Sequence, residues 1–562
     1  MYRSLYLFRL ALLLALALGA AGCSHDREAS PLPDEPESQE LGMASPPPLS
    51  TQPGRPKVAE PVLKAEGKRR VRELAAEAPL AYASDLSGVR QPSAPTHRDR
   101  FAPLTDNPLH LSQQEPVSTF SIDVDTGAYA LVRRAISEGR LPASDAVRVE
   151  ELINYFDYAY AQPRNGTPFS LVTEVGPTPW NPHTRLVHVG IQGKSIAASE
   201  RPAANLVFLI DVSGSMDSPD KLPLLKAAFR LLTKQLTAQD RVTLVVYAGA
   251  SGVVLEPTAG DHQAKILSAL DRLAAGGSTH GSAGIQLAYA MAEASRIKGG
   301  INRVLLATDG DFNVGTVNHE QLIDLIEQQR SKGITLTTLG FGQGNYNDQL
   351  MEQLADKGNG NYAYIDTLNE ARKVLVEELS ATLETIAKDV KIQIEWNPAL
   401  VSEYRLIGYE NRLLNREDFN NDKVDAGDIG AGHTVTALYE ITLKEEQGQI
   451  DPLRYGSSDA VKGNGDELAF LKLRYKAPEG ETSQLISQPI SRKLMETKLA
   501  GTSENYRFSA AVAAFGQLLR GGRYTGKFAY DDVEQLARNA RGEDTFGYRS
   551  EFLQLVRQAA TL

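Results

Sequence analysis

Three loops of this 562-residue chain carry hydroxyl and carboxylate side chains in positions that could bind a metal ion. Asp211, Ser213 and Ser215 follow the apolar run 206–210 at two-residue intervals. Thr279 lies in a second loop that precedes a helical stretch, and Asp309 follows the apolar run 304–307. Oxygen ligands without imidazole or thiolate suit a hard cation. We therefore expect a divalent cation, with Mg²⁺ as first choice and Mn²⁺ or Ca²⁺ as alternatives, and an open coordination position for an incoming carboxylate.

The segments around these loops alternate between short apolar runs and amphipathic helical stretches. The predicted strands cover residues 206–210, 242–247, 304–307, 334–339 and 362–365, and the last predicted helix carries an apolar stripe from Leu368 to Ile386. Alternating strands and helices of this kind predict an α/β, doubly wound (Rossmann-like) sheet. Its ligand crevice lies beyond the carboxyl ends of the strands, where all three loops are expected.

Period-two alternation replaces this pattern on both sides of the α/β segment. It occurs within residues 170–193 and again at 390–396, 435–443 and 471–475, which indicates half-buried strands. We therefore predict that the α/β domain, 203–386, is inserted into a β-sandwich. The N-terminal flank, 117–200, and the C-terminal part, 388–562, contribute its strands, and a helical tail begins near residue 505.

The five oxygen-bearing residues resemble the metal-ion-dependent adhesion site of von Willebrand factor type A domains. The resemblance implies that hydroxyls and aspartates bind the metal directly or through water. It also implies that the metal captures an acidic residue of a protein ligand. His280 and Gly310 adjoin the site and are candidates for its rim, although His280 could equally be structural or merely exposed. The flanks resemble a bacterial family of type A domain lipoproteins, through the runs 118–126, 407–412 and 418–422.

The N-terminus resembles a bacterial lipoprotein signal. Arg3 and Arg9 precede a short apolar run, and small residues lead to Cys23. The resemblance implies that residues 1–22 are a signal peptide, that Cys23 is lipidated, and that the chain is anchored in the cell envelope, at the outer membrane of a Gram-negative bacterium. An ordinary secretory peptide is the alternative. Residues 23–116 read as a Pro-rich disordered linker.

Composition restricts the remaining functions. The formal net charge of −11 offers no electrostatic footprint for nucleic acid, and one cysteine excludes an intramolecular disulfide or a cysteine-based zinc site. The preferred function is metal-dependent protein binding and not catalysis. One alternative is a self-assembling structural scaffold, in which the same site binds an acidic residue of its own chain or of a second copy. The other is a metal-dependent hydrolase, which ranks last because no general base is evident near the site.

Overall fold

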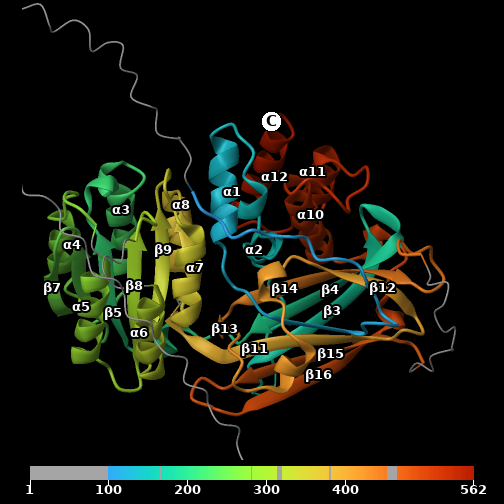
Figure 1. The fold of residues 1–562 in the computed structure, drawn as a ribbon, viewed down its shortest axis with the longest axis horizontal. Helices are drawn as coiled ribbons and strands as arrows, with labels where there is room; N and C mark the ends of the chain where they lie inside the picture. Colours follow the sequence, from blue (N-terminus) through green and yellow to red (C-terminus); the bar gives the residue numbers. More distant parts are fainter. Residues whose placement is uncertain are drawn as a thin grey trace, which may run out of the picture. The chain divides into compact units, whose positions relative to one another are not determined.

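The computed structural model describes residues 99–164, 166–279, 281–312, 319–378, 381, 383–451 and 465–562. Residues 204–365 contain an open sheet with helices on both faces, coloured green to yellow in Figure 1. The strand order is β10-β9-β8-β5-β6-β7, and neighbours run parallel except β6 and β7. The strands are β5 (Ala204–Asp211), β6 (Arg241–Tyr247), β7 (Ser251–Ala259), β8 (Ile301–Thr308), β9 (Thr335–Phe341) and β10 (Tyr362–Ile365).

Strand β5 shows why helices cover both faces of this sheet. All of its residues are buried and successive side chains point to opposite faces, so each face needs its own cover. Phe208 and Ile210 pack with α3 (Leu222–Thr233), α4 (Gln263–Asp271) and α8 (Leu368–Arg372). Val207 and Leu209 pack with α5 (Gly281–Ala294), α6 (His319–Ser331) and α7 (Asp348–Lys357). The doubly wound prediction is therefore confirmed.

Two further sheets form the predicted sandwich. One has the order β1-β12-β14-β4-β3, and the other has the order β13-β11-β15-β16, with β2 also paired to β11. Their inner faces share one hydrophobic core, which includes Val189 of β4 and Ile392 of β11. Because β3 and β4 precede the α/β domain and β11 to β16 follow it, the α/β domain is an insertion. The strands are β1 (His110–Leu111), β2 (Val117–Ser121), β3 (Phe169–Thr178), β4 (Asn181–Gly193), β11 (Thr385–Trp396), β12 (Val401–Ile407), β13 (Gly427–Gly430), β14 (Thr434–Leu443), β15 (Glu467–Lys476) and β16 (Ser483–Ser491).

The predicted helical tail packs with helices from the N-terminal flank. Phe156, just after α2, meets Phe508 of α10 and Phe552 of α12, so residues of the N-terminal flank and of the tail share one core. The ribbon shows α1 and α2 beside α10 and α12 (Figure 1). Leu438 of β14 also belongs to this core, so the helices pack against the sandwich. The helices are α1 (Gly127–Ser137), α2 (Val149–Asn154), α10 (Glu504–Leu519), α11 (Tyr530–Arg538) and α12 (Tyr548–Ala559). None of the helices in the described ranges combines the length and apolarity that crossing a membrane requires.

Two elements of the α/β domain differ from the sequence prediction. The edge strand β7 was not predicted, because its apolar run is short and its limits are set by antiparallel pairing with β6. Ile386 was predicted on the last helix, yet it lies in β11, which begins at Thr385 by pairing with Gly430 of β13. The apolar spacing of the helix continues by coincidence into this strand.

Part of the segment predicted as an N-terminal linker is folded. Residues 99–116 were assigned to it, but Asp99 forms an ion pair with Arg134 of α1 at 2.9 Å, and β1 pairs with β12. Their polar composition hid these contacts, which depend on partners far along the chain. The signal peptide, Cys23 and the rest of the linker lie outside the described residues.

Candidate metal site

Asp211 is the last residue of β5 and is fully buried between two neighbouring strands. Its Oδ2 accepts hydrogen bonds from Thr308 Oγ1 at 3.0 Å and from Tyr247 Oη at 3.1 Å. Thr308 ends β8 and Tyr247 ends β6, so the parallel register of three adjacent strands brings these groups together. The Ser213 amide donates to Asp211 Oδ1 at 2.8 Å. The carboxylate is thus fixed in orientation at the carboxyl edge of the sheet.

The two serines lie side by side in the loop after β5. Their Oγ atoms are 3.0 Å apart, with Ser213 buried and Ser215 exposed. The loop containing Thr279 is held against this one, because the Gly214 amide donates to the Gly277 carbonyl at 3.0 Å and the Gly276 amide donates to the Val212 carbonyl at 2.8 Å. Thr279 itself is half-buried two residues beyond that contact.

Asp309 directly follows β8 and is buried beside the first loop. The Asp311 amide donates to its Oδ1 at 3.2 Å, and Lys221 Nζ lies 2.9 Å from its Oδ2. Gly310 has a φ of +81°, and a Cβ there would lie 2.5 Å from the Tyr346 ring. Gly310 is therefore a packing position of the loop, and His280, the other predicted rim residue, lies outside the described residues.

The donor set at this edge fits a hard divalent cation. Carboxylate and hydroxyl oxygens from Asp211, Ser213, Ser215 and Asp309 gather on adjacent strand ends, with the Thr279 loop bonded to them. Burial raises the pKa of Asp211, and the negative charge of Asp309 adds to this effect, against hydrogen bonds from Ser213 and Thr308 that lower it. A cation would offset the repulsion between the two carboxylates, so the site is electrostatically suited to receive one.

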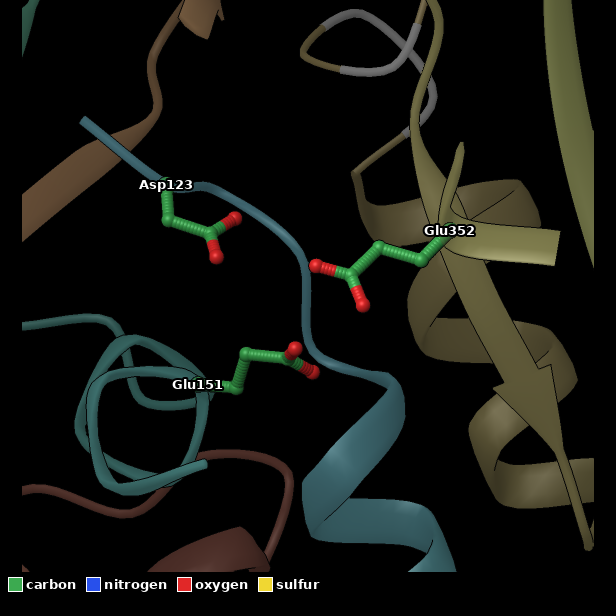
Figure 2. A group of neighbouring side chains, drawn as sticks. All are labelled: Asp123, Glu151 and Glu352. Atoms are coloured by element: carbon green, nitrogen blue, oxygen red, sulfur yellow. The ribbon is translucent and has the colours of Figure 1, made fainter. Parts of the chain in front are cut away.

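A second group of carboxylates lies elsewhere in the molecule, and sequence reasoning did not find it. Oxygens of Asp123, Glu151 and Glu352 lie within 4.8 Å of one another, and all three residues are buried. Figure 2 shows their side chains converging from the segment after β2, from α2 and from α7. The first two elements belong to the N-terminal flank, and α7 belongs to the inserted domain.

Two arginines, Arg148 buried and Arg412 partly buried, already pair with this acidic group. Arg148 binds Asp348 through Nη1 at 2.6 Å and also pairs with Glu151 through Nε. Arg412 donates to Glu352 Oε1 at 3.0 Å and to Asp123 Oδ2 at 3.1 Å. The guanidinium groups occupy the carboxylate oxygens that a metal would need. We call the whole set of residues the ionic junction. It consists of Arg148, Arg412, Asp123, Glu151, Asp348 and Glu352, together with Asp125 and Asp356, which also pair with Arg412.

Carboxylates outnumber guanidinium groups in the ionic junction, and burial favours the protonated form of two of them. Burial raises the pKa of Glu151 to about 8, although Arg148 opposes the shift. Burial also raises the pKa of Glu352. The runs 118–126 and 407–412, which carry part of the family resemblance, meet here through Asp123 and Arg412. Their role in the structure is to join the inserted domain to both flanks.

Comparison with known proteins agrees with this architecture. Residues 205–378 match the family model described as von Willebrand factor type A domain, and residues 95–188 match the model described as von Willebrand factor. Residues 381–562 match the model described as Uncharacterized protein YfbK, C-terminal. The chain is similar to the protein of that name from Escherichia coli (strain K12), with 49% identity over 469 residues, 82% of this chain and 81% of that protein.

More distant similarities cover smaller parts of the relatives or show lower identity. Uncharacterized protein sll0103 of Synechocystis sp. is 27% identical over 187 residues, 33% of this chain and 43% of that protein. A solved von Willebrand factor type A structure from Catenulispora acidiphila is 18% identical, covers 70% of this chain and 91% of that one, and has a TM-score of 0.39. Type A domains commonly bind divalent metal ions and are associated with protein interaction or adhesion.

Proposed function

Because this chain belongs to the family of Escherichia coli YfbK and carries a von Willebrand factor type A domain, we propose that it is a metal-dependent receptor of the cell envelope. Its metal-loaded site captures an Asp or Glu side chain of a protein partner. The proposal includes binding and no catalytic step.

The arrangement at the carboxyl edge of β5 and β8 carries this proposal. The candidate ligands are Asp211, Ser213, Ser215, Thr279 and Asp309, and Mg²⁺ is the cation that their hard oxygens suit best. Thr308 and Tyr247 orient the Asp211 carboxylate by donating to the same oxygen, Oδ2. The bound cation supplies a positive charge with an open coordination position, which an acidic side chain can fill.

The cell-envelope location rests on Cys23 and the apolar run before it. In this proposal Cys23 carries the lipid anchor, and the Pro-rich segment up to residue 98 separates the anchor from the folded part.

Metal-dependent capture from a membrane extract tests the proposal. The full chain, loaded with Mg²⁺ or treated with a chelator, is compared with Ser215→Ala and Thr279→Ala, because both side chains are at least partly exposed and their truncation spares the core. Ser268→Ala, an exposed hydroxyl on α4 away from the candidate ligands, is the matched control. We expect both site variants to bind Mg²⁺ at least about tenfold more weakly, with loss of the captured partner, and the control to match the parent.

Two results would count against this function. If Ser215→Ala and Thr279→Ala bind Mg²⁺ like the parent in calorimetry, the proposed ligands do not form the metal site. If Mg²⁺ instead increases the mass of the purified chain in light scattering and captures no other protein, the site serves self-assembly.

A further inference from the structure

The ammonium group of Lys221 lies where it competes directly with a metal ion. Lys221 immediately precedes α3 and is 7% exposed. Its Nζ is 2.9 Å from Oδ2 of Asp309, a side chain with no exposed surface. One of the two carboxylates that would bind the cation is therefore already paired with a positive charge from the protein.

The position of Lys221 is built into the fold. The aliphatic part of its side chain passes over Gly342, where a Cβ would lie 2.2 Å from Lys221 Cε. Gly342 has a φ of +70°, and its carbonyl accepts a hydrogen bond from Arg134 of α1 at 3.0 Å. Only a residue without a side chain leaves room for the lysine here, so the loop after β9 directs the ammonium group towards Asp309.

Charge balance gives this ion pair a consequence for binding. Two carboxylates and one ammonium group leave the empty site with a single net negative charge. A divalent cation turns this into a single positive charge, which one carboxylate of a ligand then neutralises. Without the ammonium group, the metal alone would neutralise the site, and a ligand carboxylate would make it negative again.

We propose that Lys221 is a resident counter-cation that makes metal binding and carboxylate capture mutually dependent. It stabilises Asp309 in the metal-free protein, weakens the binding of metal alone, and favours the ternary complex with an acidic ligand. This inference rests on the proposed function, because it concerns the same site.

The test compares Lys221→Met with the parent in calorimetric titrations of the full chain with Mg²⁺, in the presence and absence of acetate. We expect the variant to bind Mg²⁺ about tenfold more tightly, because a charge-assisted hydrogen bond no longer has to be broken. Acetate should tighten Mg²⁺ binding in the parent and not in the variant. Lys221→Arg, which keeps the charge, and Lys234→Met, which removes an exposed charge at the end of α3, should behave as the parent does.

Thermal unfolding gives an independent measurement of the same ion pair. In chelator, Lys221→Met should melt below the parent, since Asp309 is left buried and unpaired, and saturating Mg²⁺ should restore more stability to the variant than to the parent. A variant that folds only with Mg²⁺ would support the inference equally, and its refolding titration gives the affinity.

Each pattern of results separates the two proposals. If parent and Lys221→Met bind Mg²⁺ equally and respond to acetate alike, the role of Lys221 is refuted while the proposed function stands. If the variant binds Mg²⁺ and the parent does not, even with acetate present, Lys221 blocks the site and both the mutual dependence and the proposed function are refuted. If neither binds, both are wrong.

Discussion

Replacing Arg148 by Met should destabilise the protein far more than removing an exposed arginine, because Arg148 holds the inserted domain to the flank at a fully buried site. Its side chain is 2% exposed, and that of Asp348 is 0% exposed. Removing one partner of a buried ion pair typically lowers the free energy of unfolding by about 3–5 kcal/mol. Arg230→Met on α3 breaks an exposed pair with Asp271 and should lower it by less than about 1 kcal/mol.

The pH at which Arg148→Met is measured should change the size of the loss. Burial raises the pKa of Glu151 to about 8 and also raises that of Glu352, with Arg148 opposing both shifts. Below about pH 8 the folded parent keeps Glu151 protonated, and a neutral carboxyl group gains little from the arginine, so the absence of Arg148 matters less there. Urea unfolding should therefore show a larger difference between parent and variant at pH 8 than at pH 5. Two results would refute the idea that the ionic junction holds the inserted domain to the flank. One is an equal loss of unfolding free energy for Arg148→Met and Arg230→Met, and the other is a difference between parent and Arg148→Met that grows towards pH 5.

Two further predictions concern a buried histidine and the proposed lipid anchor. His188 of β4 is buried with its Nε2 2.9 Å from Tyr160 Oη, and burial lowers its pKa to about 4. Since the unfolded chain takes up this proton near pH 6.5, stability present above that pH is lost as the pH falls towards 4. The loss should reach about 2 kcal/mol by pH 5 in urea unfolding and should be smaller in His188→Gln, and an unchanged pH dependence would contradict it. Cys23→Ser should release the chain from the membrane fraction or leave it unprocessed, and unchanged fractionation and mass would remove the lipid anchor from the proposal.

The order of strands and helices could be predicted from the sequence, because the buried face of each element sets the spacing of its apolar residues. The buried strand β5 is a continuous apolar run, and β11 alternates where one face meets the second sheet, so both were identified. Edge strand β7 and the start of β11 were missed, because their limits depend on pairing with β6 and β13. The sandwich could be inferred only from similar patterns on both sides of the α/β segment.

The position of the candidate ligands at one sheet edge could be predicted for the same topological reason. Asp211 and Asp309 each follow an apolar strand, and parallel neighbours place their carboxyl ends at one edge. The groups that set the charge around them could not be predicted. Lys221 is one of many lysines before or within helices, and Arg148 meets Asp348 from 200 positions away. No pattern in the neighbouring sequence indicates an ion pair whose two residues come together only when the chain folds.

Helix α7 shows how the candidate site and the ionic junction share one element. Asp348, Glu352 and Asp356 recur at every fourth position of α7, so they lie on one face, and this face meets Arg148 and Arg412. Immediately before α7, the loop with Tyr346 packs against Gly310, the residue after Asp309. The loop that carries a candidate metal ligand thus packs against the segment that leads into a helix held to the flanks by ion pairs. A ligand that moved Asp309 would work against buried ion pairs, so the flanks stabilise the geometry of the site as well as the position of the domain.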